Sequence, residues 1–247
     1  RSRGLGDVYK RQLVASPLGK VIATPLTEAV EDIAVVVAEG EAEFIRCVAG
    51  KVRFDVVITD LIWNRPDGDW SFDGLDAIDV LRDADRVAPV LLATQGHSME
   101  LEHLEEARTR DEVRGIVDKS DGFGAIARAV QRAALGERAP IDVPRINVHP
   151  LCGQFVGQRG TTAGRLAGAI ASGTASDNAS LAVAAHVSPN TANKVTSHYL
   201  GPIISRRGEH DPNLALTQAA IYRWCGLHAR YIVSWCRRHG HGDVLTP

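Results

Sequence analysis

Residues 54–60 read Phe-Asp-Val-Val-Ile-Thr-Asp, and the prediction of the fold starts there. A short apolar run that is rich in β-branched residues and ends in one carboxylate is typical of a strand buried in a parallel sheet. Two later runs have the same form: residues 90–94 end in the hydroxyl of Thr94, and residues 115–119 end in the amine of Lys119. Doubly wound α/β folds place their chemistry at the carboxyl ends of strands. We therefore expect Asp60, Thr94 and Lys119 to gather at one edge of a sheet.

Helical and extended patterns alternate around these three strands. The further predicted elements are a strand at Ile33–Ala38 and helices at Glu41–Ala49, Leu75–Arg82, Met99–Arg108 and Ala125–Leu135. Such alternation predicts a doubly wound, parallel, five-stranded α/β sheet with helices on both faces.

The start of this domain has two possible registers. Residues 7–12 (Asp-Val-Tyr-Lys-Arg-Gln) match the translation of a transposon end used to prepare sequencing libraries, so residues 1–12 are interpreted as a non-native artefact and left out of the fold prediction. In one register, Leu13–Ala15 is the remnant of the first strand and the helix at 17–31 contains Pro25. In the other, Lys20–Ala23 is the strand and a shortened helix follows.

The rear of the chain predicts a small all-α domain. A proline-containing linker at 137–160 follows the first domain (13–136), and the second domain occupies 161–247. Helices are predicted at Thr161–Ala171 and Asn178–Ala185. Ser188-Pro189 then gives a strong helix-start signal, and that helix runs to about Leu200, where Gly201-Pro202 should stop it. Helix, turn and capped polar helix make a helix-turn-helix module.

Charge is distributed unevenly along the chain. Residues 13–140 carry 14 Lys+Arg against 24 Asp+Glu, a balance of −10, whereas residues 151–247 carry 9 against 4, a balance of +5. This asymmetry predicts that only the rear half meets a polyanion. The absence of a long apolar run, of a secretory leader and of a disulfide pattern among the four cysteines predicts a cytoplasmic protein with no membrane partner. No nucleophile motif or phosphate-cradling glycine loop stands out, which argues against an enzyme.

The acid, hydroxyl and amine at three successive strand ends resemble the receiver domain of bacterial two-component response regulators. Residues 171–191 are similar to the LuxR-type DNA-binding domain, and the two together point to the NarL/FixJ class. The resemblance implies a flavodoxin-like receiver in which a partner histidine kinase phosphorylates Asp60, with Mg²⁺ as cofactor. Thr94 and Lys119 would then sense the phosphoryl group.

The sequence departs from this family in several places, two of which concern the metal site. Receivers usually carry an acidic pair after the first strand to hold the metal, but the two registers offer only Ala15-Ser16 or Thr24-Pro25. Between Asp60 and the next helix there is also an insertion, in which Asp67 and Asp69 either supply replacement carboxylates or belong to a solvated loop. The metal site is therefore predicted from Asp60 alone.

The helix after Ser188 presents a polar, weakly basic face that suits double-stranded DNA, since Asn can read adenine and Lys can reach guanine or phosphate. The predicted contacts are Pro189, Asn190, Thr191, Asn193, Lys194, Ser197 and His198, whereas Ala192, Val195 and Tyr199 pack inward. A single lysine gives little electrostatic attraction, so we expect tight binding to require a homodimer. The alternatives are a regulator that works without phosphorylation, and a protein-interaction adaptor that binds no DNA.

Leu216–His239 is predicted as one long helix that either mediates dimerisation, as in the resembling family, or completes the core of the domain. Cys225 with His228 and Cys236 with His239 superficially resemble zinc-ligand pairs. On one continuous helix the two pairs lie roughly 16 Å apart, too far to share an ion. We therefore predict no zinc site unless the helix breaks near Arg230.

Overall fold

The computed structural model describes residues 10–16, 19–30, 32–50, 52–64, 71–139 and 147–246. Its contacts divide the chain into two compact units. The sheet unit comprises Arg1–His97 and Ala107–Asp142, and the helical unit comprises Ser98–Glu106 and Val143–Pro247. Each unit is described by itself.

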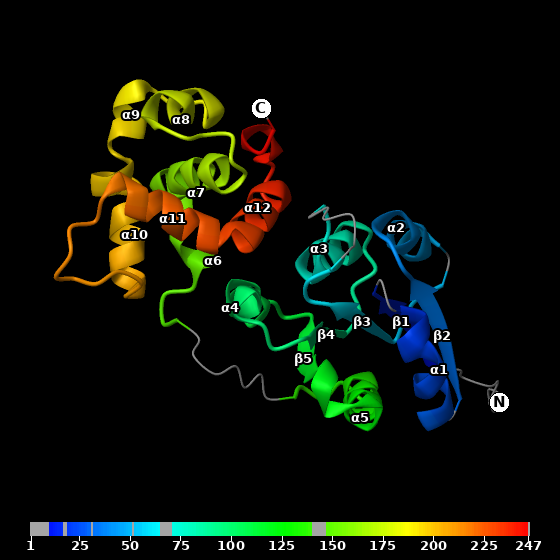
Figure 1. The fold of residues 1–247 in the computed structure, drawn as a ribbon. Coiled ribbons are helices and arrows are strands. Elements are labelled where there is room, and N and C mark those ends of the chain that lie inside the picture. The colour runs from blue at the N-terminus through cyan, green and yellow to red at the C-terminus, as the bar shows by residue number, and fades with distance from the viewer. Residues whose placement is uncertain are drawn as a thin grey trace. The chain divides into compact units, whose positions relative to one another are not determined.

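The sheet unit contains a five-stranded sheet in the order β2-β1-β3-β4-β5, and every paired strand is parallel (Figure 1). Its strands are β1 (Lys10–Ala15), β2 (Ile33–Ala38), β3 (Val56–Asp60), β4 (Val90–Thr94) and β5 (Val113–Asp118). The strand order reverses between β1 and β3, which places a crevice at the carboxyl ends of these two strands. The predicted doubly wound parallel sheet, followed by a helical part, is confirmed.

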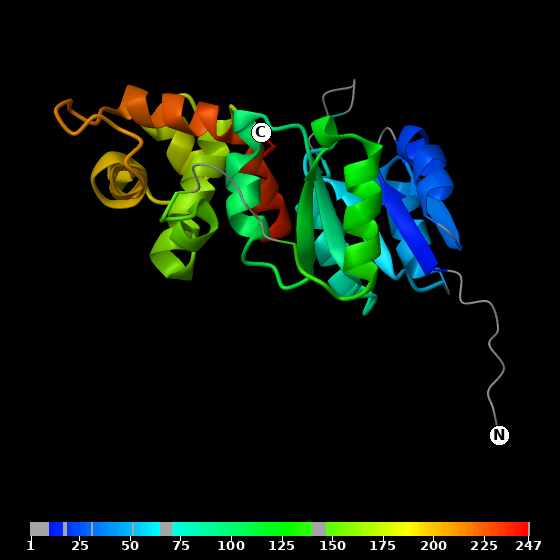
Figure 2. The same ribbon diagram turned by 90° about the horizontal axis from the view of Figure 1, so that it is seen from below.

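Helices cover both faces of the sheet. They are α1 (Gly19–Ala29), α2 (Glu41–Ala49), α3 (Gly74–Asp83) and α5 (Phe123–Ala134). Figure 1 shows α1 and α5 on one face and α2 and α3 on the other, and Figure 2 gives the same unit from below. On the first face, Ile22 of α1 and Val130 of α5 join the strand residues Val14, Ile58 and Leu91 in one buried cluster. This burial of apolar area supplies the main driving force for the fold of the unit.

The first strand settles the question of register. Residues 10–15 pair with β2, and residues 12–15 also pair with β3, so the register that makes Lys20–Ala23 a strand is wrong. The burial of Ile22 and Leu26 against the sheet outweighs the hydrogen bond that Pro25 removes from the middle of α1. Residues 10–12, which the sequence prediction left out of the fold, form the first half of β1.

One of these three residues fits its place poorly. The side chain of Gln12 is fully buried in the sheet unit, and neither its Nε2 nor its Oε1 has a hydrogen-bond partner among the described residues. A buried amide without partners costs about 1–3 kcal/mol. A central strand favours an apolar side chain at this position.

The helical unit is a bundle of short helices. Its elements are η1 (Ser98–Glu100), α4 (Leu101–Ala107, all but the last residue), α6 (Leu151–Gln154), α7 (Gly157–Ala171), α8 (Asn178–Ala184), α9 (Pro189–Asn193), η3 (Val195–Tyr199), α10 (Leu200–Arg207), α11 (Gln218–Leu227), α12 (Ala229–Arg238) and η4 (Gly242–Val244). Helix α6 and the first turn of α7 lie in the segment for which the sequence predicts a linker. Part of that segment, residues 140–146, lies outside the described residues.

Gly201-Pro202 does not stop a helix, contrary to the prediction. The helix that begins at Pro189 ends at Asn193, a π-helical segment follows, and α10 then runs through Pro202 to Arg207. Proline has no N–H, so the carbonyl of His198, four residues before Pro202, lacks its usual main-chain donor. Arg159 supplies donors instead, and its Nε lies 2.8 Å from that oxygen. A π-turn is one of the recognised ways in which a helix accommodates such a disruption.

The predicted single helix at Leu216–His239 is also wrong, because the chain breaks at His228 into α11 and α12. The apolar residues Ile221, Trp224, Tyr231, Ile232 and Trp235 are buried and complete the core of the helical unit. Leu227 remains 74% exposed. The dimer stays a prediction.

Helix α4 is anchored in the helical unit by buried charges. The fully buried guanidinium of Arg207 on α10 lies 2.9 Å from Oε2 of Glu105, whose side chain is also fully buried. On α12, the Tyr231 hydroxyl donates to Glu106 at 2.7 Å, and Arg238 pairs with the same carboxylate at 2.6 Å. Buried carboxylates are tolerated only when paired, so these contacts specify how α4 packs in this unit.

Candidate functional site

The site at the carboxyl edge of the sheet is built from strand ends. Asp60 ends β3, Thr94 ends β4, Lys119 follows β5 and Ser16 follows β1. Because all the strands are parallel, these ends share one edge. In the register of the sheet, Asp60 lies opposite Ala93, one residue before Thr94. We call these four residues, Ser16, Asp60, Thr94 and Lys119, the Asp60 site.

The carboxylate of Asp60 is engaged on both oxygens. The Ser16 hydroxyl donates to Oδ2 at 2.8 Å, and the ammonium of Lys119 lies 2.8 Å from Oδ1. Asp60 is only 4% exposed, and burial raises its pKa above the ordinary value, although Lys119 and Ser16 both act in the opposite direction. Thr94 is buried beside them. The structure thus brings Asp60 and Lys119 into contact, as the strand-end argument expects, and it adds Ser16.

The segment after β3 packs against the end of β3 that carries Asp60. The indole nitrogen of Trp63 donates to the Thr59 hydroxyl at 3.1 Å, and Trp63 is almost completely buried. Helix α3 starts at Gly74, where an added Cβ would lie 2.7 Å from the Asp60 carbonyl oxygen. Only glycine permits this close approach. Asp67 and Asp69 of the insertion lie outside the described residues.

The described residues around Asp60 do not fit a magnesium ion. A hard divalent cation takes several oxygen ligands, usually including more than one carboxylate or a phosphate. Among the described residues no group of three potential ligands includes Asp60, the charge of its carboxylate is balanced by Lys119, and Ser16 offers a neutral hydroxyl. Within the part of the chain that the structure describes, the one group of at least three potential metal-binding side chains is Glu102, Glu209 and His228, all of which belong to the helical unit.

The second site is the surface of the helix-turn-helix. An N-cap begins each of its two helices: Asp177 accepts from the Ser180 amide in a capping box, and Ser188 accepts from the Thr191 amide at 3.1 Å. These bonds satisfy amides that the first helical turn would otherwise leave without partners. His186 lies in the turn between the helices with a positive φ of 52°, a conformation that few residues other than glycine adopt.

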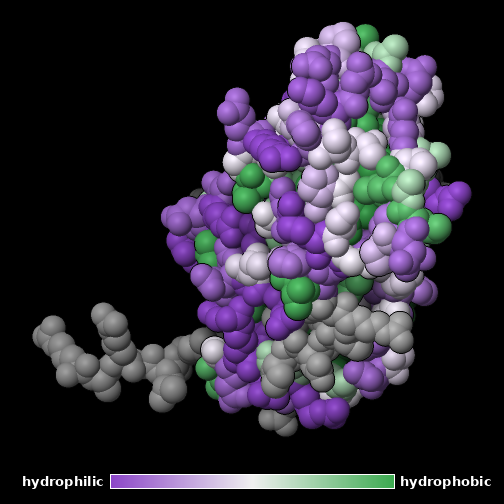
Figure 3. All heavy atoms as spheres, turned by 90° about the vertical axis from the view of Figure 1, so that its left-hand side faces the viewer, coloured by the Kyte–Doolittle hydropathy of each residue, from purple (hydrophilic) through white to green (hydrophobic). Residues whose placement is uncertain are grey.

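The predicted division between a polar face and an apolar face is present. Six of the seven predicted contacts are exposed and Thr191 is half-buried, whereas Ala192 and Val195 are buried and Tyr199 is half-buried. The exposed six are Pro189, Asn190, Asn193, Lys194, Ser197 and His198. Figure 3 looks at the side of the chain on which α9 and α10 lie in Figure 1; hydrophilic side chains predominate there, and hydrophobic ones form small patches. The role of this face in DNA binding stays a prediction.

Two of the polar side chains on this face are already engaged within the unit. Oδ1 of Asn193 accepts from Asn178 at 3.0 Å, and the Thr191 hydroxyl pairs with Ser188 at 2.9 Å. Asn190 and Lys194 make no such bond among the described residues, so they are the better candidates to contact an outside partner.

The cysteine–histidine pairs do not form a metal centre among the described residues. Although the chain breaks at His228, no group of three ligands includes Cys225 or Cys236. Both thiols are buried, and burial raises the pKa of Cys236 to about 12. A thiol must lose its proton to bind zinc, so these positions suit core packing instead.

The sequence prediction did not include two side chains that the structure places in notable contacts. Ser16 enters the Asp60 site because β1 extends from Lys10 and places residue 16 at the same edge as the other strand ends. Arg159 lies in the segment predicted as a linker, where no pattern marks its contact with the carbonyl of His198. The rule that strand ends share an edge could have found the first residue, but no local signal points to the second.

Comparison with known proteins gives remote structural similarities only. No family model and no curated protein matches the chain. Promoter-bound RcsB from Salmonella enterica serovar Typhimurium is similar at a TM-score of 0.46 and 16% identity, over 87% of this chain and 98% of that chain. A complex of the response regulator RcsB with DNA is similar at 0.49 and 16%, over 87% and 96%. A Francisella response regulator receiver domain is similar at 0.40 and 18%, over 51% and 98%. Similarities at these scores and identities establish no family for the chain.

None of the helices that the structure describes has the length and apolar character needed to cross a bilayer.

Proposed function

We propose that this protein is a DNA-binding transcriptional regulator whose helical unit contacts double-stranded DNA. The observation that carries the proposal is the capped α8–α9 pair with its exposed polar face, located in the half of the chain that carries excess positive charge. A second helix presented in this way can enter the major groove and read base edges.

The individual contacts follow from the chemistry of the exposed side chains. Asn190 suits adenine, because its amide offers both a donor and an acceptor, and Lys194 suits guanine or a phosphate oxygen. Ser197 and His198 follow in η3, are exposed as well, and can contact the phosphate backbone of the DNA. The positive charge on α9 and η3 is small, which is why binding as a homodimer to paired half-sites is part of the proposal.

The sheet unit is proposed to control the helical unit, and the geometry of the Asp60 site favours control that does not use a phosphoryl group. The Ser16 hydroxyl donates to one oxygen of the carboxylate, Lys119 forms an ion pair with the other, and among the described residues no group of three potential metal ligands includes Asp60. Phosphorylation of Asp60 by a partner histidine kinase, with Thr94 and Lys119 as sensors, is the competing mode of control.

The DNA-binding proposal is tested by fluorescence anisotropy of the full chain with pooled duplex fragments at low and moderate salt. We expect saturable, salt-sensitive binding that weakens at least about tenfold in Asn190→Ala/Lys194→Ala, because each good base or phosphate contact contributes about 1–3 kcal/mol. Arg128→Ala on α5 is the matched control, since it removes an exposed positive charge from the sheet unit. A folded protein that binds no duplex under either condition would instead support the protein-interaction adaptor.

The mode of control is tested separately. The full chain is incubated with acetyl phosphate and Mg²⁺, and the intact mass is measured, with Asp60→Asn as the control. We expect no gain of a phosphoryl group. A hydroxylamine-sensitive adduct that is absent from Asp60→Asn would overturn control without phosphorylation and support the histidine kinase as partner.

A further inference from the structure

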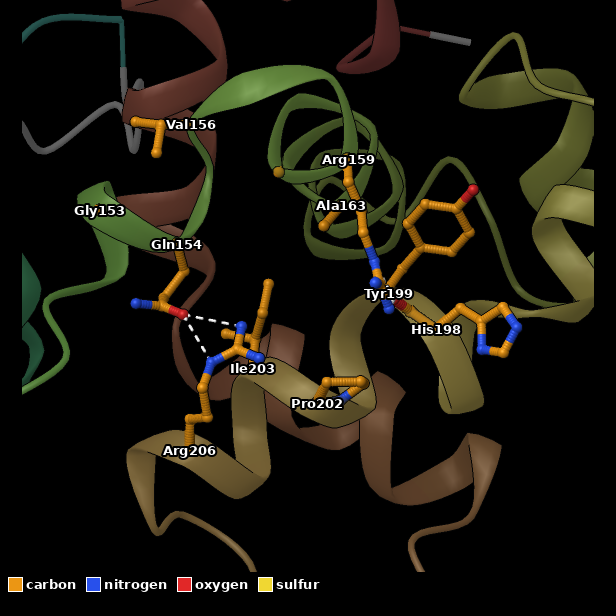
Figure 4. A pocket seen from close by; sticks show the side chains of 11 residues that line it. Gly153, Gln154, Val156, Arg159, Ala163, His198, Tyr199, Pro202, Ile203 and Arg206 are labelled. Carbon is orange, nitrogen blue, oxygen red and sulfur yellow. Dashed lines mark hydrogen bonds between the residues drawn. The ribbon is translucent and has the colours of Figure 1, made fainter.

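A pocket in the helical unit is lined by two arginines and by no acidic residue. It has a volume of about 250 Å³ and lies between α6, the start of α7, the π-helical segment η3 and α10 (Figure 4). Arg159 comes from α7 and Arg206 from α10, and no residue in its lining carries a carboxylate. The pocket therefore has a formal charge of +2 when its histidine is neutral.

Each of the two guanidiniums has a neutral partner. Nε of Arg206 donates to Oε1 of Gln154 at 3.0 Å and Nη2 donates to the same oxygen at 2.9 Å, which Figure 4 marks with dashed lines. Arg159 donates Nε and Nη2 to the carbonyl of His198. Among the described residues, neither Nη1 group makes a hydrogen bond, and neither arginine forms a salt bridge.

Other arginines of the same unit behave differently. Arg165 pairs with Asp243 at 2.7 Å, and Arg207 and Arg238 pair with carboxylates of α4. Arg159 and Arg206 are both exposed, and because no carboxylate offsets their charges in the pocket lining, the pocket has a positive potential that attracts anions. The planar fork of each guanidinium matches the spacing of phosphate oxygens.

We propose that this pocket binds a small phosphate-bearing molecule, a site that goes beyond the proposed contact with DNA. Arg159 and Arg206 would bind the phosphate through their Nη1 groups, which make no hydrogen bond to Gln154 or His198. Tyr199, Pro202 and Ile203 add apolar and aromatic surface that an organic group attached to the phosphate can contact. The volume is sufficient for a phosphate with a short organic body and lies near the small end of ligand sites.

The position of the pocket connects the ligand with the DNA-reading surface. The His198 carbonyl that Arg159 holds belongs to η3, the segment between α9 and α10. A ligand that draws the guanidinium of Arg159 toward its phosphate weakens this hold on η3. Occupancy of the pocket is therefore expected to change the position of α9 and of the side chains that it offers to DNA.

The site is tested by isothermal titration calorimetry of the full chain with sodium pyrophosphate at constant ionic strength. We expect saturable binding, weakened about tenfold in Arg159→Gln and in Arg206→Gln, because each substitution removes charge-assisted hydrogen bonds. Arg128→Gln, which removes an exposed charge from the sheet unit, should bind like the wild type. Circular dichroism checks that each variant is folded.

Two results would overturn the proposal. One is the absence of saturable heat, or equal affinity in the wild type and both folded pocket variants. The other is loss of duplex DNA binding in both variants while pyrophosphate does not bind, which would make the two arginines contacts for the DNA backbone. Failure of the DNA-binding proposal itself leaves the pyrophosphate titration unaffected, so the two proposals fail independently.

Discussion

Replacing Arg207 with methionine should destabilise the helical unit strongly. Both side chains of the Arg207–Glu105 pair are fully buried, so Arg207→Met leaves the carboxylate of Glu105 without its counter-charge. Breaking a buried pair in this way costs about 3–5 kcal/mol. The amides of Asn147 and Leu151 still donate to this carboxylate at 3.2 and 3.1 Å. These remaining donors place the expected loss near the lower end, at about 3 kcal/mol.

The second half of the cycle removes the charge that is left behind on Glu105. The other two carboxylates beside Arg207 keep partners of their own, because Trp224 donates to Glu209 at 2.7 Å and His228 lies 2.7 Å from Glu102. In Glu105→Gln/Arg207→Met both positions are neutral, and the glutamine oxygen can still accept from the two amides. We expect the double variant to recover to within about 1 kcal/mol of the wild type, because replacing a whole buried pair is often close to neutral. Urea denaturation at neutral pH, followed by circular dichroism, gives the free energies of unfolding.

This cycle also examines where α4 packs, because Glu105 lies on that helix and Arg207 lies on α10. If Arg207→Met loses less than about 1 kcal/mol, Glu105 is not left buried and unpaired, and the packing of α4 in the helical unit is wrong. A double variant that is as unstable as the single one would show that shape, rather than charge, explains the loss.

Three further outcomes are expected. Asp60→Asn should have a higher free energy of unfolding than the wild type at pH 8, and this difference should shrink toward pH 4. The reason is that burial raises the pKa of the Asp60 carboxyl in the folded protein. The stability that its protonated form contributes is fully present below the ordinary carboxyl pKa and is lost as the pH rises through the raised pKa. A difference between variant and wild type that grows on acidification contradicts this reasoning. Gly164→Ala should lower the free energy of unfolding by about 1–3 kcal/mol, because the added Cβ would overlap the buried indole of Trp235 on α12. Gly226→Ala on α11, where nothing lies within contact of an added Cβ, should raise it by about 0.4–1 kcal/mol. Thermal unfolding compares the two variants directly. Gln12→Leu should gain about 1–3 kcal/mol in urea denaturation, since it replaces a buried amide without partners, and a loss would show that the amide has a partner after all.

The elements of the sheet unit were predictable because their signals are local. The strand at Ile33–Ala38 and the helix at Glu41–Ala49 have the predicted bounds. The strand is an unbroken apolar run, the helix has apolar residues at helical spacing, and both have clear ends. Contact between Asp60 and Lys119 was predictable for a related reason: parallel strands must end at one edge, so residues 59 positions apart meet without any further information. The insertion beyond Trp63 interrupts these patterns, and no element was predicted within it.

The helical unit shows the limit of local signals. Gly201-Pro202 has the composition of a helix stop, yet α10 continues because Arg159, far away in sequence, satisfies the carbonyl that the proline leaves open. Periodicity also predicted one helix where the chain breaks at His228, because both halves have buried apolar positions and nothing in the pattern marks the change of direction. Long-range contacts selected the conformation in both places.

Hydrophobic periodicity, strand-end chemistry and capping residues were enough to establish a parallel α/β sheet, a helix-turn-helix and the positions that face solvent. These are properties of neighbouring residues and of the regular geometry of strands and helices, so they can be read before any contact is known. The tertiary structure alone decided the packing of α4 within the helical unit, the contact of Arg159 with the His198 carbonyl and the presence of Arg159 and Arg206 in the lining of one pocket. Each of these depends on residues distant in sequence that come together only when the chain is folded, because burial and charge pairing are properties of the assembled core.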